Sequence, residues 1–371
     1  MLSVAIFGVL AYAVLPFGNS QAATADPYYQ FEQPTQIVSL ENGAQLALYC
    51  SGRGSPTVIL ESGAGGRTYE SWYRLQPLVA EQTRVCSYDR AGFGFSRLGH
   101  DLPRDLNHDI ADLHDLLPGA GERGPYVLIG HSMGGTLVGA YADKYPDQVA
   151  GMVLLEPAVV LSADEVSETE SAEGHKHRRS LEQDLQKFKR CAARMDALHA
   201  APQPKPKDDC LDTNYFNSLP PAMANVELKH ESRPEYWWAL ESELRNNWLG
   251  VDARQAARFM PHRWRSIPIR VITAAVSEAG DKELAQTTGI PIADKVSLGA
   301  VRKNHARSER RQARVCEFSS DCKVTTIRTA EHFVQNADPD KVAHVVQELT
   351  TVIRKERMNA ITPADSIHDK R

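Results

Sequence analysis

The chain has 371 residues, of which 42% are hydrophobic and 24% charged, and its formal net charge is −5. This composition is ordinary for a globular protein, and the length allows a large core. Without a net positive charge or a broad basic surface, nucleic-acid binding is not expected. The length suits one large α/β domain with an insertion, or two domains.

The N-terminus begins with an apolar run from Val4 to Leu15, which is too short to span a bilayer comfortably. Small residues follow, and Ala23-Thr24-Ala25 fits the A-x-A cleavage pattern. Residues 1–25 are therefore predicted to be a secretory signal peptide, and the protein to be exported, periplasmic or secreted, with no stable membrane span. Because no Lys or Arg precedes the apolar run, anchoring by an uncleaved N-terminal segment is the alternative.

Eight short, strand-like apolar runs follow along the chain. They cover residues 35–40, 45–50, 57–62, 84–89, 126–130, 150–156, 269–274 and 323–328. Asn42-Gly43 predicts a hairpin between the first two. The later runs are nearly continuous in apolar residues, as buried parallel strands are, and helical segments separate them. The alternation predicts an α/β fold with a mostly parallel sheet and helices on both faces.

The alternation stops after residue 157. Residues 158–262 are polar and helical in pattern, without a strand signal, and are predicted to form a helical insertion. Residues 26–157 and 263–356 then form the core, and 357–371 a flexible tail. Tyr236, Trp237, Trp238 and Trp248 lie in the insertion, where they either pack against the core or line an apolar pocket.

Six cysteines form an even set, which suits an oxidising compartment. Their spacing is not that of a zinc site, and we expect no metal. Cys191–Cys210 and Cys316–Cys322 are plausible local disulfides, and six reduced thiols are the alternative.

Ser132 occupies the centre of Gly130-x-Ser132-x-Gly134, directly after one predicted strand and before a helix. A serine at such a turn has a strained backbone and needs small neighbours, because strand and helix approach closely there. The turn exposes Oγ and aims the N–H of Met133 at the same point, so Ser132 is predicted to be a nucleophile and Met133 an oxyanion donor. His131 is expected to point away from the serine along the strand.

These residues resemble the α/β-hydrolase fold superfamily, and more narrowly a bacterial branch of capped serine esterases and lipases. The resemblance rests on GHSMGG at 130–135, CSYDRAGFGFS at 86–96 and CSGRGSPTVILESGAGG at 50–66. It implies an α/β-hydrolase fold with an eight-stranded sheet and identifies 158–262 as the cap. It also implies that the second strand lies beside the fourth, which makes a Cys50–Cys86 disulfide credible.

The family's order of nucleophile, acid and histidine implies that His332, after the last strand, is the catalytic base. Some relatives hold the acid at the tip of the sixth strand, which here is Glu156. Glu278 and Asp281, after the seventh strand, are the alternatives. In the loop Ser62-Gly63-Ala64, the resemblance implies Ala64 as the second oxyanion donor, with Ser62 in place of the family's usual histidine. Asp89 and Arg90 are interpreted as a structural ion pair or loop anchor.

The chain carries no phosphate loop, Rossmann fingerprint or metal cluster, so we expect hydrolysis without a cofactor. The predicted activity is cleavage of a small-molecule carboxylic ester through an acyl-enzyme. Two alternatives remain. One is a peptidase of the prolyl aminopeptidase type, or an acyltransferase, on the same triad; the other is a non-catalytic binding protein of the same fold. The acyl group, the alcohol and the oligomeric state do not follow from the sequence.

Overall fold

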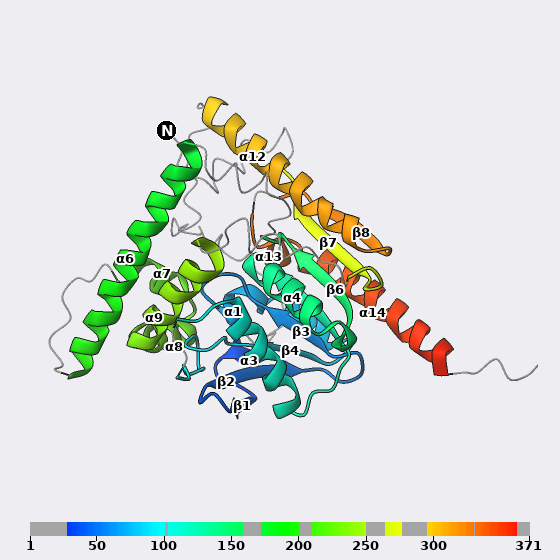
Figure 1. Cartoon of the computed structure of the whole chain (residues 1–371), viewed down its shortest axis with the longest axis horizontal. Helices are drawn as coiled ribbons and strands as arrows, with labels where there is room; N and C mark the ends of the chain where they lie inside the picture. The colour runs from blue at the N-terminus through cyan, green and yellow to red at the C-terminus, as the bar shows by residue number, and fades with distance from the viewer. Residues whose placement is uncertain are drawn as a thin grey trace, which may run out of the picture.

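The computed structural model describes residues 28–100, 103–158, 172–200, 210–211, 213–249, 264–276, 295–329 and 331–361. Figure 1 shows a twisted sheet with helices on both faces and a further group of helices to one side. The predicted signal peptide lies outside the described residues. Across the described part of the chain, no helix is both long and apolar enough to cross a bilayer.

The sheet has eight strands in the order β1-β2-β4-β3-β5-β6-β7-β8. Their bounds are β1 Gln36–Ser39, β2 Gln45–Ser51, β3 Val58–Glu61, β4 Val85–Tyr88, β5 Tyr126–His131, β6 Val149–Leu155, β7 Ile269–Ala274 and β8 Cys322–Ile327. β2 pairs antiparallel with β1 and β4, and every other pairing is parallel. The predicted α/β-hydrolase sheet is confirmed, and the second strand does lie beside the fourth.

Helices cover both faces of this sheet, because successive residues of its buried strands point to opposite sides. In β5, Leu128 faces one apolar cluster, whereas Val127 and Ile129 face the other. The first face carries α3 Leu106–Gly119, α4 Met133–Lys144 and α12 Lys295–Ala313 with the short η5 Arg314–Phe318. The second carries α1 Thr68–Trp72, α2 Leu75–Ala80, α13 Val334–Ala337 and α14 Pro339–Ile361. Short 3₁₀ turns lie at Tyr29–Phe31 and Pro146–Gln148.

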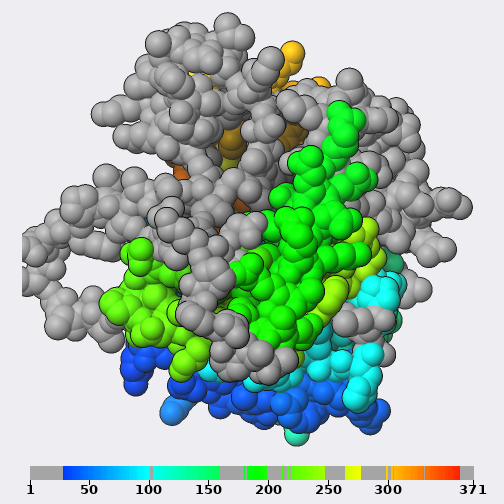
Figure 2. Space-filling model, turned by 90° about the vertical axis from the view of Figure 1, so that its left-hand side faces the viewer, coloured from blue at the N-terminus to red at the C-terminus, as the bar shows by residue number. Residues whose placement is uncertain are grey.

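The described residues of the predicted insertion are mainly helical, and these helices are called the cap below. The cap comprises α6 Ala172–Ala200, α7 Thr213–Ser218, α8 Pro221–Glu231, α9 Pro234–Glu243 and the π-helical η3 Leu244–Leu249. Its apolar cluster joins Trp237 and Leu240 of α9 to Leu185 of α6 and to Phe93 of the core. Figure 2 shows α6 as a long green ridge, with the blue and cyan residues of the core below it. The cap therefore rests on the loop that follows β4.

Three disulfides join the six cysteines as the sequence predicts. Cys50 and Cys86 lie opposite each other on β2 and β4, with their Cα atoms 4.1 Å apart. Cys191–Cys210 closes a loop within the cap, and Cys316–Cys322 joins η5 to β8. The sheet, the cap and the C-terminal part of the core are thus each cross-linked once.

Candidate active site

Ser132 lies at a sharp turn between β5 and α4. Its φ of 54° and ψ of −120° place a non-glycine residue in a strained conformation, which costs about 1–3 kcal/mol. Its N–H donates to the Leu155 carbonyl of β6 at 2.9 Å. Its own carbonyl accepts hydrogen bonds from Gly135 and Ala158, both at 2.9 Å. Three backbone hydrogen bonds therefore hold the strained residue in place.

The glycines around Ser132 are required by close backbone contacts. A Cβ on Gly130 would lie 2.3 Å from the Gly134 carbonyl oxygen. A Cβ on Gly134 would lie 2.3 Å from the carbonyl oxygen of Glu61, at the end of β3. Because real Cβ contacts are never this short, the strand and helix can meet at Ser132 only with glycine at both positions. The glycines of the sequence motif predict this close approach of strand and helix.

Glu156 and His332 lie together at the carboxyl edge of the sheet. Glu156 directly follows β6 with a φ of 46°, and its Oε1 accepts a hydrogen bond from the Ala274 N–H of β7 at 2.6 Å. Its Oε2 lies 3.6 Å from Nδ1 of His332, in the segment between β8 and α13. The Glu156 side chain is buried, whereas that of His332 is 47% exposed. Glu278 and Asp281, the alternative acids, lie outside the described residues.

The contact between His131 and His332 was not predicted from the sequence. The buried ring of His131 lies beside that of His332, with 4.7 Å between centroids, and its Nε2 donates to the His332 carbonyl at 3.0 Å. Burial and the nearby His332 keep the pKa of His131 well below its usual range, so the ring stays neutral. His131 therefore fixes the backbone of the His332 segment. Its position at the end of β5, next to a predicted nucleophile, was the available signal.

The loop after β3 runs alongside Ser132. A Cβ on Gly63 would lie 3.3 Å from the Ser132 Cβ, so the two backbones are neighbours. Ser62 is buried and its Oγ accepts a hydrogen bond from Trp72 Nε1 at 2.9 Å. Within the described part of the chain, the N–H groups of Ala64 and Met133 have no hydrogen-bond partner. Both expected oxyanion donors are therefore free to bind a substrate oxygen.

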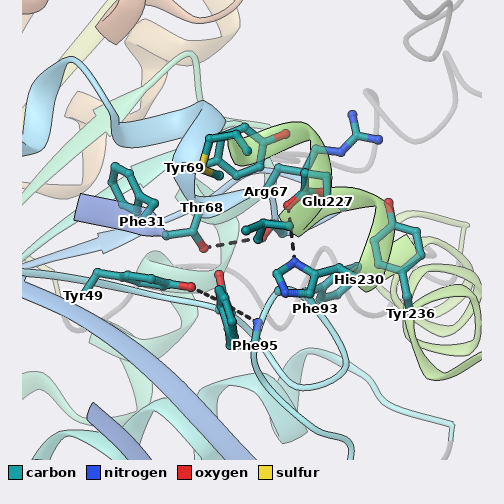
Figure 3. Close-up of a pocket in the computed structure, with 16 residues that line it drawn as sticks. Phe31, Tyr49, Arg67, Thr68, Tyr69, Phe93, Phe95, Glu227, His230 and Tyr236 are labelled. Carbon is teal, nitrogen blue, oxygen red and sulfur yellow. Dashed lines mark hydrogen bonds and ion pairs between the residues drawn. The ribbon is translucent and has the colours of Figure 1, made fainter. Parts of the chain in front are cut away.

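A small pocket lies between Gly65 and Gly66 of this loop and α8 of the cap. Figure 3 shows Glu227 and His230 of α8 pointing toward each other among aromatic side chains. Its volume is about 10 Å³, room for a single water. Burial raises the pKa of Glu227 to about 7 and lowers that of His230 to about 4. The residues around the pair are Phe31, Tyr49, Arg67, Tyr69, Phe93, Phe95 and Tyr236. The charges of Glu227 and His230, on the α8 side of the pocket, therefore depend on pH.

A larger hollow of about 950 Å³ lies at the carboxyl ends of β7 and β8. Thr326, Thr329, Glu331 and Lys341 are among the residues that line it. Because Glu331 precedes His332 in the chain, the hollow adjoins the segment that carries the histidine.

The sequence and the fold match known proteins. A family model for the alpha/beta hydrolase fold matches residues 56–197. The serine hydrolase CarC, involved in carbazole degradation, superposes with a TM-score of 0.52 at 17% identity, over 85% of this chain and 98% of CarC. The chain has the alpha/beta hydrolase fold. This likeness concerns the fold alone, since the identity between the sequences is low.

Curated relatives match shorter segments. The 2-hydroxy-6-oxo-2,4-heptadienoate hydrolase of Pseudomonas putida is 32% identical over 117 residues, which are 31% of this chain and 42% of that protein. Lipase LipV of Mycobacterium tuberculosis is 37% identical over 101 residues, which are 27% of this chain and 37% of the lipase. The chain spans less than half the length of the first curated relatives it matches.

Proposed function

We propose that this alpha/beta hydrolase protein is a serine hydrolase that cleaves carboxylic esters through an acyl-enzyme. The observation that carries the proposal is the strained Ser132 at the start of α4, combined with the Glu156 carboxylate 3.6 Å from His332 Nδ1 on the same edge of the sheet. A nucleophile, a base and a group that orients the base are the parts that acyl transfer by serine requires.

In the proposed reaction, His332 takes the proton from Ser132 Oγ as the oxygen attacks the ester carbonyl carbon. Glu156 orients His332 and stabilises its charged form. The N–H groups of Met133 and Ala64 bind the oxyanion, and His332 then protonates the departing alcohol. Water, deprotonated by His332, then attacks the acyl carbon; the bond to Ser132 Oγ breaks, His332 returns the proton to Oγ, and the acid is released. No cofactor takes part in these steps.

Similarity to a lipase supports the ester substrate, and similarity to a 2-hydroxy-6-oxo-2,4-heptadienoate hydrolase favours that compound as a second candidate substrate. We further propose that the protein acts after export, because three disulfides suit an oxidising compartment.

The test is hydrolysis of p-nitrophenyl esters from acetate to palmitate by residues 26–371, with Ser132→Ala as the matched variant. We expect turnover that falls by several orders of magnitude in Ser132→Ala, since members of a catalytic unit act together. A fluorophosphonate should label only the wild type. Equal ester hydrolysis by both proteins would contradict the mechanism. Cleavage of the dienoate, or of peptides with a free amino terminus, in place of esters would reassign the substrate. Failure of the fluorophosphonate to label Ser132 would favour a binding protein.

A further inference from the structure

Arg90, in the loop after β4, is buried, and its guanidinium donates four hydrogen bonds. Nε and Nη2 both contact Glu243 Oε2 at 2.8 Å, and Nη1 contacts Glu61 Oε1 at 2.6 Å. Two of its hydrogen bonds go to backbone carbonyls, from Nη1 to Ser62 at 2.8 Å and from Nη2 to Gly63 at 2.7 Å. A buried guanidinium held by four hydrogen bonds and by ion pairs with two carboxylates has one defined orientation. Arg90 therefore fixes the backbone that follows β3.

Glu243 reaches the same loop from the cap. It is the last residue of α9, its side chain is 4% exposed, and its second oxygen accepts a hydrogen bond from the Gly65 N–H at 2.8 Å. One carboxylate thus holds Arg90 with one oxygen and the loop with the other. The loop is held on both sides of Ala64, at the Gly63 carbonyl through Arg90 and at the Gly65 N–H directly.

The hydrogen bonds on both sides of Ala64 set the direction of its N–H. The peptide between Gly63 and Ala64 is planar and trans, so its carbonyl and its N–H point in opposite directions. Because the Gly63 carbonyl points at Arg90, the Ala64 N–H points away from the guanidinium. The Ala64 methyl group packs against the apolar cluster of the cap. Both the direction of the N–H and the position of the residue therefore depend on groups outside the loop.

We infer that Arg90 and Glu243 are positioning residues that align the Ala64 N–H for the oxyanion, and that this alignment requires α9 of the cap to be docked. The inference rests on the proposed function. It makes the cap part of the machinery that stabilises the transition state, in addition to covering the site. Glu243 acts only through the loop and Arg90.

The test compares Glu243→Gln with Glu241→Gln in otherwise unchanged protein. Glu241 lies on the same helix and pairs with Arg245 and Lys189, away from the loop. Glu243→Gln keeps the side-chain shape but cannot accept from both Arg90 and Gly65. We expect its kcat on the preferred p-nitrophenyl ester to fall about 10–100-fold with KM nearly unchanged, part of the loss for an oxyanion donor. Glu241→Gln should match the wild type.

Two further measurements separate positioning from general structure. A boronic acid forms a tetrahedral adduct with the serine. In Glu243→Gln, the affinity for this compound should fall by about the same factor as kcat, while the affinity for the carboxylic acid product stays constant. Arg90→Lys should give the same pattern. Thermal unfolding establishes that each variant is folded.

The outcomes are distinct. If the wild type shows Ser132-dependent hydrolysis and Glu243→Gln matches Glu241→Gln, the inference is wrong and the proposed function stands. If Glu243→Gln raises KM and lowers boronate and product affinity equally, the residue only shapes the binding site, and the inference is also wrong. A wild type without Ser132-dependent hydrolysis would overturn both.

Discussion

Ser132 and Glu156 share a property at the scale of single residues: among the described residues other than glycine, they alone have a positive φ. A side chain in this region costs energy, and such residues persist only where surrounding contacts hold them. Both follow directly on strands, and both are fixed by backbone partners from neighbouring strands. Strain at these two positions favours Glu156 as the acid of the proposed triad.

Replacing Glu156 tests this assignment. Glu156→Gln keeps the acceptor for the Ala274 N–H but removes the charge beside His332. We expect kcat on p-nitrophenyl esters to fall about 10³–10⁴-fold, as when an aspartate of a serine triad becomes its amide. Glu278→Gln and Asp281→Asn serve as matched controls and should stay within about threefold of the wild type. A large loss in either control, with activity kept in Glu156→Gln, would move the acid to the segment after β7.

At the scale of elements, the turn between β5 and α4 is packed against the end of β3. A Cβ on Gly134 would meet the carbonyl oxygens of Glu61 and Ser62 at 2.3 and 2.7 Å, the first at the end of β3 and the second in the proposed oxyanion loop. The start of α4 therefore limits the position of that loop on the side of the sheet. Arg90 and Glu243 fix it on the side of the cap.

Gly134→Ala should therefore destabilise the fold by about 1–3 kcal/mol through overpacking. It should also lower kcat, because the loop must shift. Gly299→Ala in α12 is the control, since a Cβ there meets no atom within 4 Å. This control should gain up to about 1 kcal/mol from the better helix propensity of alanine. Urea unfolding of both variants measures the difference. A Gly134→Ala protein as stable as the wild type would show that the backbone near Gly134 can shift without loss of stability.

The sequence predicts the helices and strands better than it predicts the contacts between elements that are far apart in the chain. Ser132 could be identified because strand, turn and helix are contiguous in the chain. His332 and Glu156 could be expected to meet because parallel strands end at the same edge of a sheet. By contrast, the bond from Gly65 to Glu243 joins residues 178 positions apart and depends on how α9 docks. Periodicity specifies which face of a helix is apolar, but not which backbone atom an acidic residue at its end will reach.

At the scale of the whole molecule, the interface between cap and core contains buried ionisable groups, and folding is therefore linked to pH. The pKa of Glu227 rises from 4.5 to about 7 on burial. Between these values the native state holds a proton that the unfolded chain has released. The contribution of Glu227 to the free energy of unfolding therefore falls as pH rises through this window. His230, with a pKa lowered to about 4, gives an opposite slope between about pH 4 and 6.5.

Glu227→Gln isolates this effect. The variant has no proton to lose at this position, so its stability relative to the wild type should increase between pH 5 and 8, by at most about 3 kcal/mol. Urea unfolding of both proteins at each pH measures the change, and His230 remains present in both. Glu317→Gln, an exposed surface change, should show a constant difference. A constant difference for Glu227→Gln as well would mean that Glu227 has the same pKa in the folded and unfolded protein.

The strained backbone at Ser132 and Glu156 also has an evolutionary consequence. Glycine adopts a positive φ without the penalty that other residues incur, so Ser132→Gly or Glu156→Gly relieves backbone strain while removing the proposed chemistry. A lineage freed from selection for activity would gain stability by losing these two side chains early.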